Sequence, residues 1–285
     1  MHKIAYLLAF TLLTLSATAQ ELENALLWKV SGNGLETSYI YGTMHVLCDA
    51  TLTQQVEEAL EYTQLVVLEL DMDSPTLQTE MMKRMMFPKG ETISKYLTEE
   101  EYKILDTFLK EHAAMGLALL DSMAPIMIES MLIPSMMDCP MQSIEGNLMA
   151  HAKREQEEVL GLETVDDQFD AFDAIPIKEQ AQSLLKKAKD GIEKDRAMFK
   201  KMQDAYVKQN LIALMYMLTD DGGDFMKNRE VLLDNRNKKW IPRIIEISKK
   251  QSTFYGVGAA HLAGESGVIQ LLRKEGYTVT PVLAN

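Results

Sequence analysis

The chain has 285 residues, of which 47% are hydrophobic, and this composition suits one large globular domain and excludes a disordered chain. Its formal net charge of −13 at pH 7 argues against nucleic acid and anionic lipid as partners, because like charges repel. Polyanionic partners are therefore not expected.

The first residues have the layout of a cleavable secretory signal. Lys3 precedes an apolar stretch over 4–15, and small residues follow up to Gln20. We expect a signal peptide over 1–19 and a periplasmic or secreted mature protein over 20–285. An uncleaved membrane anchor is the alternative, but the stretch is shorter than the roughly 20 apolar residues that a span needs, so no membrane anchor is expected after cleavage.

The next segments predict a sheet. Two β-prone runs, 26–30 and 37–42, are joined by Asn33 and Gly34, a pair typical of hairpin turns. A helix is expected over 54–62 and a buried strand over 65–70. This β-α-β order predicts parallel pairing of the flanking strands.

Helical patterns dominate the rest of the chain. Thr98 and Glu101 form a capping box that opens a helix reaching about His112, and most of 177–250 is helical, with a kink or restart at Pro242. Strands are expected over 158–162, 253–257 and 277–282, and a helix over 265–275. The predicted fold class is α/β: a single domain with a central, mostly parallel or mixed sheet and large helical insertions about 74–156 and 177–250.

One segment occurs twice. Residues 37–46 (TSYIYGTMHV) align with 253–262 (TFYGVGAAHL), and each copy reads strand, GxxH, aliphatic residue. His45 and His261 then follow the carboxyl ends of their strands, where parallel α/β sheets bind ligands. The sheet is expected to contain two β-GxxH-α-β units that bring both histidines to one crevice if their strands are neighbours. The alternative is that each histidine only hydrogen-bonds a local turn.

Two carboxylates accompany the histidines. Glu69 interrupts the apolar run 66–70, where a charge is costly unless it is paired or binds a metal. Glu163 follows the strand 158–162 at the same predicted edge, although it could equally be a first-turn acid of the next helix. Two imidazoles with carboxylates are a familiar set of ligands for divalent metals.

Three further polar residues lie on the last long helical segment. Arg229 and Arg236 are seven positions apart, which places them on one face of a regular helix, and Asn237 follows. Their side chains could bind a substrate carboxylate or stabilise an oxyanion. Alternatively, the arginines pair with Glu230 and Asp234.

The chain contains two cysteines, Cys48 and Cys139. In an oxidising compartment they could form one disulfide, while a reactive thiol is the alternative. Neither their number nor their spacing suits a cysteine-based zinc site.

Methionines recur at helical spacing at positions 81, 82, 85, 86, 123, 127 and 131. This periodicity predicts core positions, with a copper(I) site or an adaptable apolar groove as alternatives. If these methionines line the cleft, the substrate is expected to be an apolar peptide.

The segments LLWKVSGNGLETSYIYGTMHV, LVVLELD, EVLGLET, DNRNKKW and FYGVGAAHLAGESGVIQLLRKEGYTVTPV together resemble the TraB/GumN family, which includes the TIKI metalloproteases. The resemblance implies an α/β fold related to the erythromycin-esterase and ChaN-like group. For the TIKI members it implies peptide hydrolysis dependent on a divalent metal, with manganese or cobalt supporting activity. The paired GxxH histidines of the family correspond to His45 and His261 and its strand acid to Glu69, while Glu163 and Arg236 match further characteristic positions.

The site residues and the resemblance together predict an exported metal-dependent hydrolase of the metallopeptidase class, acting on a peptide or small-molecule substrate. His45, His261 and Glu163 would hold manganese or cobalt, or alternatively zinc or iron, and the metal would lower the pKa of bound water. Glu69 would act as general base or as a further ligand, and Arg236 with Arg229 would bind substrate or stabilise the intermediate. The alternatives are a non-catalytic haem- or iron-binding protein of the ChaN type and a metal-free esterase with His45 as base.

Overall fold

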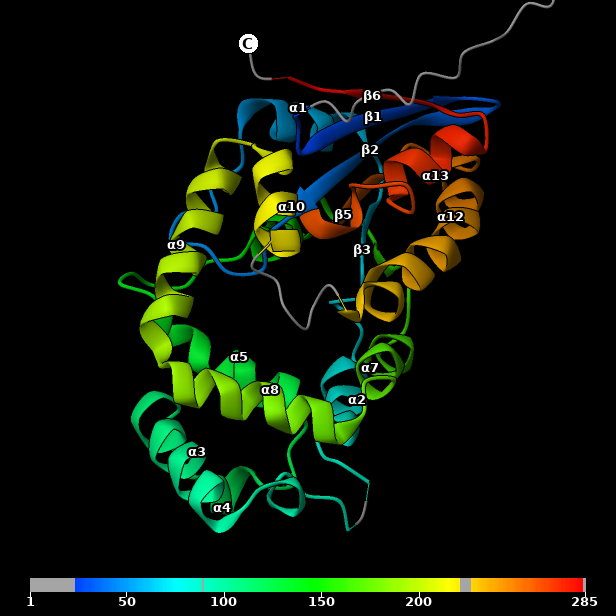
Figure 1. Cartoon of the computed structure of the whole chain (residues 1–285). Coiled ribbons are helices and arrows are strands. Elements are labelled where there is room, and N and C mark those ends of the chain that lie inside the picture. Colours follow the sequence, from blue (N-terminus) through cyan, green and yellow to red (C-terminus); the bar gives the residue numbers. More distant parts are fainter. Residues whose placement is uncertain (1–23, 89, 221–226, 284–285) are drawn as a thin grey trace, which may run out of the picture.

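The computed structural model describes residues 24–88, 90–220 and 227–283 (Figure 1). The predicted signal peptide, 1–19, lies outside the described residues. Within the described part, no helix is both long and apolar enough to cross a membrane.

A six-stranded mixed sheet forms the centre of the molecule, in the order β4-β3-β5-β2-β1-β6. The strands are β1 (Leu27–Gly32), β2 (Leu35–Thr43), β3 (Val66–Leu68), β4 (Val159–Gly161), β5 (Phe254–Gly258) and β6 (Thr278–Pro281). The four strands β4, β3, β5 and β2 pair in parallel, whereas β1 is antiparallel to both β2 and β6. The prediction of an α/β fold with a mostly parallel or mixed sheet is therefore confirmed.

The β1–β2 hairpin follows from its turn residues. Asn33 and Gly34 have φ values of +49° and +77°, the left-handed conformation that Asn and Gly adopt most readily. The parallel strand β3 is fully buried, as expected for a strand covered by helices on both faces.

Two groups of helices interrupt the parallel strands. Between β3 and β4 lie α2 (Leu77–Arg84), η1 (Ser94–Tyr96), α3 (Glu99–His112), α4 (Leu117–Leu120), α5 (Pro125–Leu132), η2 (Ile133–Met136) and α6 (Ile144–Glu155). Between β4 and β5 lie α7 (Val165–Asp173), α8 (Ile177–Asp190), α9 (Ile192–Val207), α10 (Leu211–Asp220), the π-helix η3 (Glu230–Asp234) and α12 (Asn235–Ser248). The remaining helices among the described residues are α1 (Gln54–Tyr62), η4 (Ala259–His261) and α13 (Val268–Lys274).

The helix ends and irregularities have local causes. Thr98 and Glu101 form the predicted capping box at the start of α3, with both reciprocal hydrogen bonds present. Pro242 lies inside α12, which continues through it. The irregular turn is instead η3, directly before α12, so the predicted restart at Pro242 is wrong in position.

The described helices arrange into two packed regions. The larger core includes Trp28, Trp240 and Tyr255 and surrounds the sheet, while a separate core with Leu105 and Leu184 joins α3 to α8. In Figure 1, α9, α8, α7 and α12 form an arch below the sheet.

The predicted core role of the clustered methionines is wrong for those on α2 and directly after it. None of the seven is fully buried, and Met82 and Met86 are 58% and 49% exposed. The reason is that α2 has no buried residue at all, so its helical periodicity does not correspond to a core-facing stripe. Met123 and Met131 pack at the margin of the smaller core.

Candidate active site

The two GxxH segments lie side by side at the carboxyl ends of β2 and β5. These strands are parallel neighbours, with Thr43 opposite Gly258. A Cβ atom on Gly42 would lie 2.7 Å from Leu262 Cδ1, and one on Gly258 would lie 3.2 Å from Glu69 Oε1 and 4.0 Å from His45 Nε2. The glycines of the motif therefore allow the two segments and Glu69 to approach one another.

His261 is buried and held in a fixed orientation. Its Nδ1 lies 2.6 Å from Asn237 Oδ1, and the amide nitrogen of Asn237 donates to the Ser266 carbonyl at 2.8 Å. This orientation of Asn237 makes Nδ1 the donor and leaves the lone pair on Nε2, which accepts from Arg236 Nη1 at 3.2 Å. Burial, assisted by the nearby positive charges, lowers the pKa of His261 to about 3. His261 is thus a neutral imidazole at physiological pH.

His45 has the opposite surroundings. Its side chain is 69% exposed and contacts a buried carboxylate, with 2.7 Å between Nδ1 and Glu145 Oε1. This hydrogen bond raises the pKa of His45 to about 9. Burial alone would raise the pKa of Glu145, but the contact with His45 holds it below its ordinary value. The two residues therefore form an ion pair at neutral pH.

Glu69 and Glu163 share one guanidinium. Arg236 Nη2 donates to Glu69 Oε2 at 2.6 Å and to Glu163 Oε1 at 2.5 Å. Burial opposes the ionisation of Glu69, yet His261, Arg236 and the Gly258 amide together hold its pKa at about 2. For Glu163, burial prevails over the contacts with Arg236, so its pKa is raised.

Trp240 completes the arrangement around Arg236. Its indole nitrogen donates to Glu163 Oε2 at 3.0 Å, and its ring lies 4.4 Å from the His261 ring and 5.0 Å from the Arg236 guanidinium. Both oxygens of Glu163 are therefore occupied by donors from α12.

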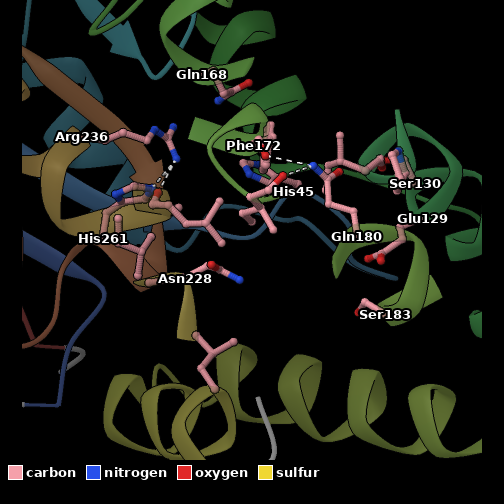
Figure 2. A pocket seen from close by; sticks show the side chains of 18 of the residues that line it. His45, Glu129, Ser130, Gln168, Phe172, Gln180, Ser183, Asn228, Arg236 and His261 are labelled. Atoms are coloured by element: carbon pink, nitrogen blue, oxygen red, sulfur yellow. Dashed lines mark hydrogen bonds between the residues drawn. The ribbon is translucent and has the colours of Figure 1, made fainter. Parts of the chain in front are cut away.

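Some of these groups face a cavity of about 1110 Å³. His45, Glu69, Arg236 and His261 belong to its lining, and Glu163 lies behind Arg236. Figure 2 shows Arg236 and His261 on one side of the cavity and Gln180, Ser130 and Ser183, from α8 and α5, on the other. The structure thus brings four of the predicted site residues to one space.

Two of the predicted substrate-binding residues, Asn237 and Arg229, are not among the residues that line the cavity. Asn237 is only 1% exposed and holds His261, while Arg229 pairs with Asp234 at 3.2 Å. The π-helix η3 separates the two arginines, and its wider turn changes the rotation expected for a regular helix. These positions suit structural support of the site better than contact with a substrate.

Sequence reasoning missed two polar contributors. Glu145 lies 100 positions from His45, and it lies in the first turn of α6, where acids are common for purely local reasons. Gln168, on α7, donates to Glu69 and Glu163 at 3.3 Å each. The burial of Glu145 carried no sequence signal, whereas the strand context of Glu69 did.

The donor types suit a borderline divalent cation. Both histidines have Nδ1 fixed by a side-chain oxygen, an outer-shell arrangement typical of metal-binding histidines, and Glu69 adds a carboxylate. Arg236, however, contacts both His261 Nε2 and Glu69 in the structure. Across the described residues, no three His, Cys, Asp or Glu side chains are already clustered as a metal site.

The molecule is thus a mixed α/β protein with a paired-histidine site at the carboxyl edge of its parallel strands. The chain belongs to the TraB/PrgY/gumN family, whose model matches residues 26–281. It is also similar to the metalloprotease TIKI1 of zebrafish (Danio rerio), with 20% identity over 321 residues that cover 92% of this chain and 64% of the zebrafish protein. The chain therefore spans just under two thirds of that relative. No solved structure matches the chain.

Proposed function

We propose that this protein is an exported hydrolase that cleaves peptide bonds with the help of a divalent cation. The observation that carries the proposal is the convergence of His45, Glu69 and His261 on one cavity, with both imidazoles oriented through Nδ1. The name of the zebrafish relative supports peptide hydrolysis. The disulfide between Cys48 and Cys139 supports an oxidising compartment, periplasmic or extracellular.

His45, His261 and Glu69 are the residues that would hold the cation, which supplies Lewis acidity and lowers the pKa of bound water. To bind it, His45 would release its Nε2 proton and Arg236 would give up its contact with His261 Nε2, so binding should be accompanied by proton release. Glu69 suits a ligand better than a general base, because a carboxyl with a pKa of about 2 remains ionised and is a weak base near neutral pH. Glu163 serves instead to orient Arg236, whose guanidinium can donate to an oxygen that gains negative charge.

Calorimetric titration of manganese, cobalt, zinc and iron into the metal-stripped protein tests this proposal. We expect about one equivalent to bind, and His45→Ala and His261→Ala to weaken binding strongly. His112→Ala is the matched control, because His112 packs against Phe108 on α3. Binding that ignores the first two substitutions, or no saturable binding, overturns the metal site. Titration with hemin in the same series tests the haem-binding hypothesis.

Metal-free ester hydrolysis is a second candidate, favoured by the contact between His45 and Glu145. A carboxylate on Nδ1 orients the imidazole and stabilises its protonated form. Because the pKa of His45 is raised to about 9, only its deprotonated fraction can accept a proton from water, so the rate of this reaction should rise as the pH approaches 9. Ester hydrolysis that survives exhaustive chelation and is lost in His45→Ala would support this candidate over the metallopeptidase.

The cavity lining supports an apolar peptide as substrate. Met81, Met127 and Met202, from three different helices, line the cavity together with Phe169 and Phe172. Met127→Glu should therefore lower kcat/KM for apolar peptides at least about tenfold, the consequence of losing one buried apolar contact of about 1.4 kcal/mol. Met82→Glu is the control, since Met82 is 58% exposed and is not a lining residue. Equal kinetics in both variants would contradict the apolar preference.

A further inference from the structure

The segment that follows His45 is fastened to the start of α6 at several points. Leu47 and Gln142 exchange two backbone hydrogen bonds, of 2.8 Å and 2.9 Å. The Gln142 side chain accepts from the Ala50 amide at 3.2 Å, and the Asn147 side chain donates to the Ala50 carbonyl at 2.7 Å. These contacts hold two parts of the chain that are distant in sequence.

A disulfide crosses the same junction. Cys48 and Cys139 are bonded with 5.5 Å between their Cα atoms and are 91 positions apart. Cys48 is exposed and Cys139 partly buried, so a reductant can reach the bond. Because the disulfide closes a long loop, it restricts the chain strongly.

The two fastened segments carry the two members of the His45–Glu145 pair. His45 lies three positions before Cys48, and Glu145 lies six positions after Cys139. Ser143 caps α6 by accepting from the Gly146 amide at 2.9 Å, which fixes the first turn that bears Glu145. Buried Glu145 therefore presents its carboxylate at a site that depends on how these segments are joined.

We propose that the Cys48–Cys139 disulfide, Gln142 and Asn147 act together as a positioning clamp that holds His45 against Glu145, so that the hydrolase site depends on the oxidised disulfide. The clamp lies outside the reacting groups and acts through His45. In reduction by a dithiol, the S–S bond breaks, each cysteine gains a proton and an electron, and the dithiol becomes a disulfide. The link to turnover rests on the proposed function, but the clamp can be measured without it.

Hydrogen exchange of the full chain, followed by mass spectrometry, tests the clamp directly. We expect amides of residues 44–50 to exchange at least about tenfold faster after reduction with dithiothreitol and alkylation, because the restraint on opening is removed. Amides of β5 should stay protected, which shows that the fold persists. Unchanged exchange over 44–50 would overturn the proposal.

Asn147→Ala tests the clamp in a chain that keeps its disulfide, so the result does not depend on whether the reduced protein stays folded. It should speed exchange over 44–50 and lower kcat more than it changes KM. The control is Asn210→Ala, which also removes a side-chain hydrogen bond to the backbone, here one that Asn210 accepts from the Ala213 amide at the start of α10. Equal effects of the two variants would contradict a specific role for Asn147.

The two proposals fail in different ways. Faster exchange with no turnover in any form would uphold the clamp and overturn the hydrolase. Turnover that is unaffected by reduction, together with unchanged exchange, would uphold the hydrolase and overturn the clamp.

Discussion

His45 and His261 follow the same motif on adjacent strands but occupy contrasting environments. The His45 side chain is 69% exposed and contacts a carboxylate, whereas that of His261 is 4% exposed and contacts an amide oxygen. The pKa of His45 is raised to about 9 and that of His261 lowered to about 3. One repeated segment therefore yields a protonated and a neutral imidazole at the same pH, because the partner of Nδ1 and the degree of burial decide the charge.

The largest expected effect comes from removing either ring. His45→Ala and His261→Ala should each lower turnover by about 10²–10⁴-fold, the range for loss of a positioned catalytic group. Steady-state hydrolysis of a peptide substrate would measure this, with His112→Ala as the control. Near-normal activity in either variant would show that the histidine concerned is not needed for turnover.

Glu145→Gln converts the partner of His45 into an amide, as at His261. We expect turnover to fall by about 10–100-fold, the usual effect of losing an outer-shell partner, and the pKa of His45 to fall toward its ordinary value. Activity assays and histidine proton resonances followed over pH would measure both changes. A pKa of His45 that stays high would show that Glu145 is not its cause.

Asn237→Ala removes the fixed partner of His261. The variant should lose about 1–3 kcal/mol of unfolding free energy, because a buried imidazole N–H and two carbonyl oxygens lose a partner. Urea denaturation measures the loss, with Asn210→Ala as the comparison. A change within the error of the measurement would mean that Asn237 does not support the site.

A further prediction concerns the pH dependence of stability. The unfolded state binds a proton at His261 below about pH 6.5 that the folded state refuses until about pH 3, so stability is lost as the pH falls through this window. For His45 the folded state retains its proton up to about pH 9, so stability is present in full below pH 6.5 and is lost as the pH rises toward 9.

Thermal unfolding between pH 4 and pH 9, about the range set by these two groups, would separate the two contributions. His261→Ala should flatten the acid side of the profile and His45→Ala the alkaline side. If either variant changed the opposite side, the assignment of charge to the two rings would be reversed.

Much of this site could be predicted from short-range patterns. The glycine and histidine of each GxxH follow a strand, and Glu69 is conspicuous because a charge within an apolar run needs a partner. The structure supplies that partner, Arg236, at 2.6 Å. The methionine clusters were harder to interpret, because helical spacing places side chains on one face of a helix but does not show whether that face contacts the core, a cavity or solvent.

By itself the sequence determined the α/β order of elements, the hairpin turn and the placement of both histidines at strand ends, since local propensity, turn chemistry and strand periodicity act over a few residues. Only the tertiary structure decided that Glu145 contacts His45, that Glu163 is occupied by Arg236 and Trp240, and that Arg229 pairs with Asp234 across the π-helix η3. These contacts join residues distant along the chain, and the charge of each group depends on burial and neighbours that only folding assembles.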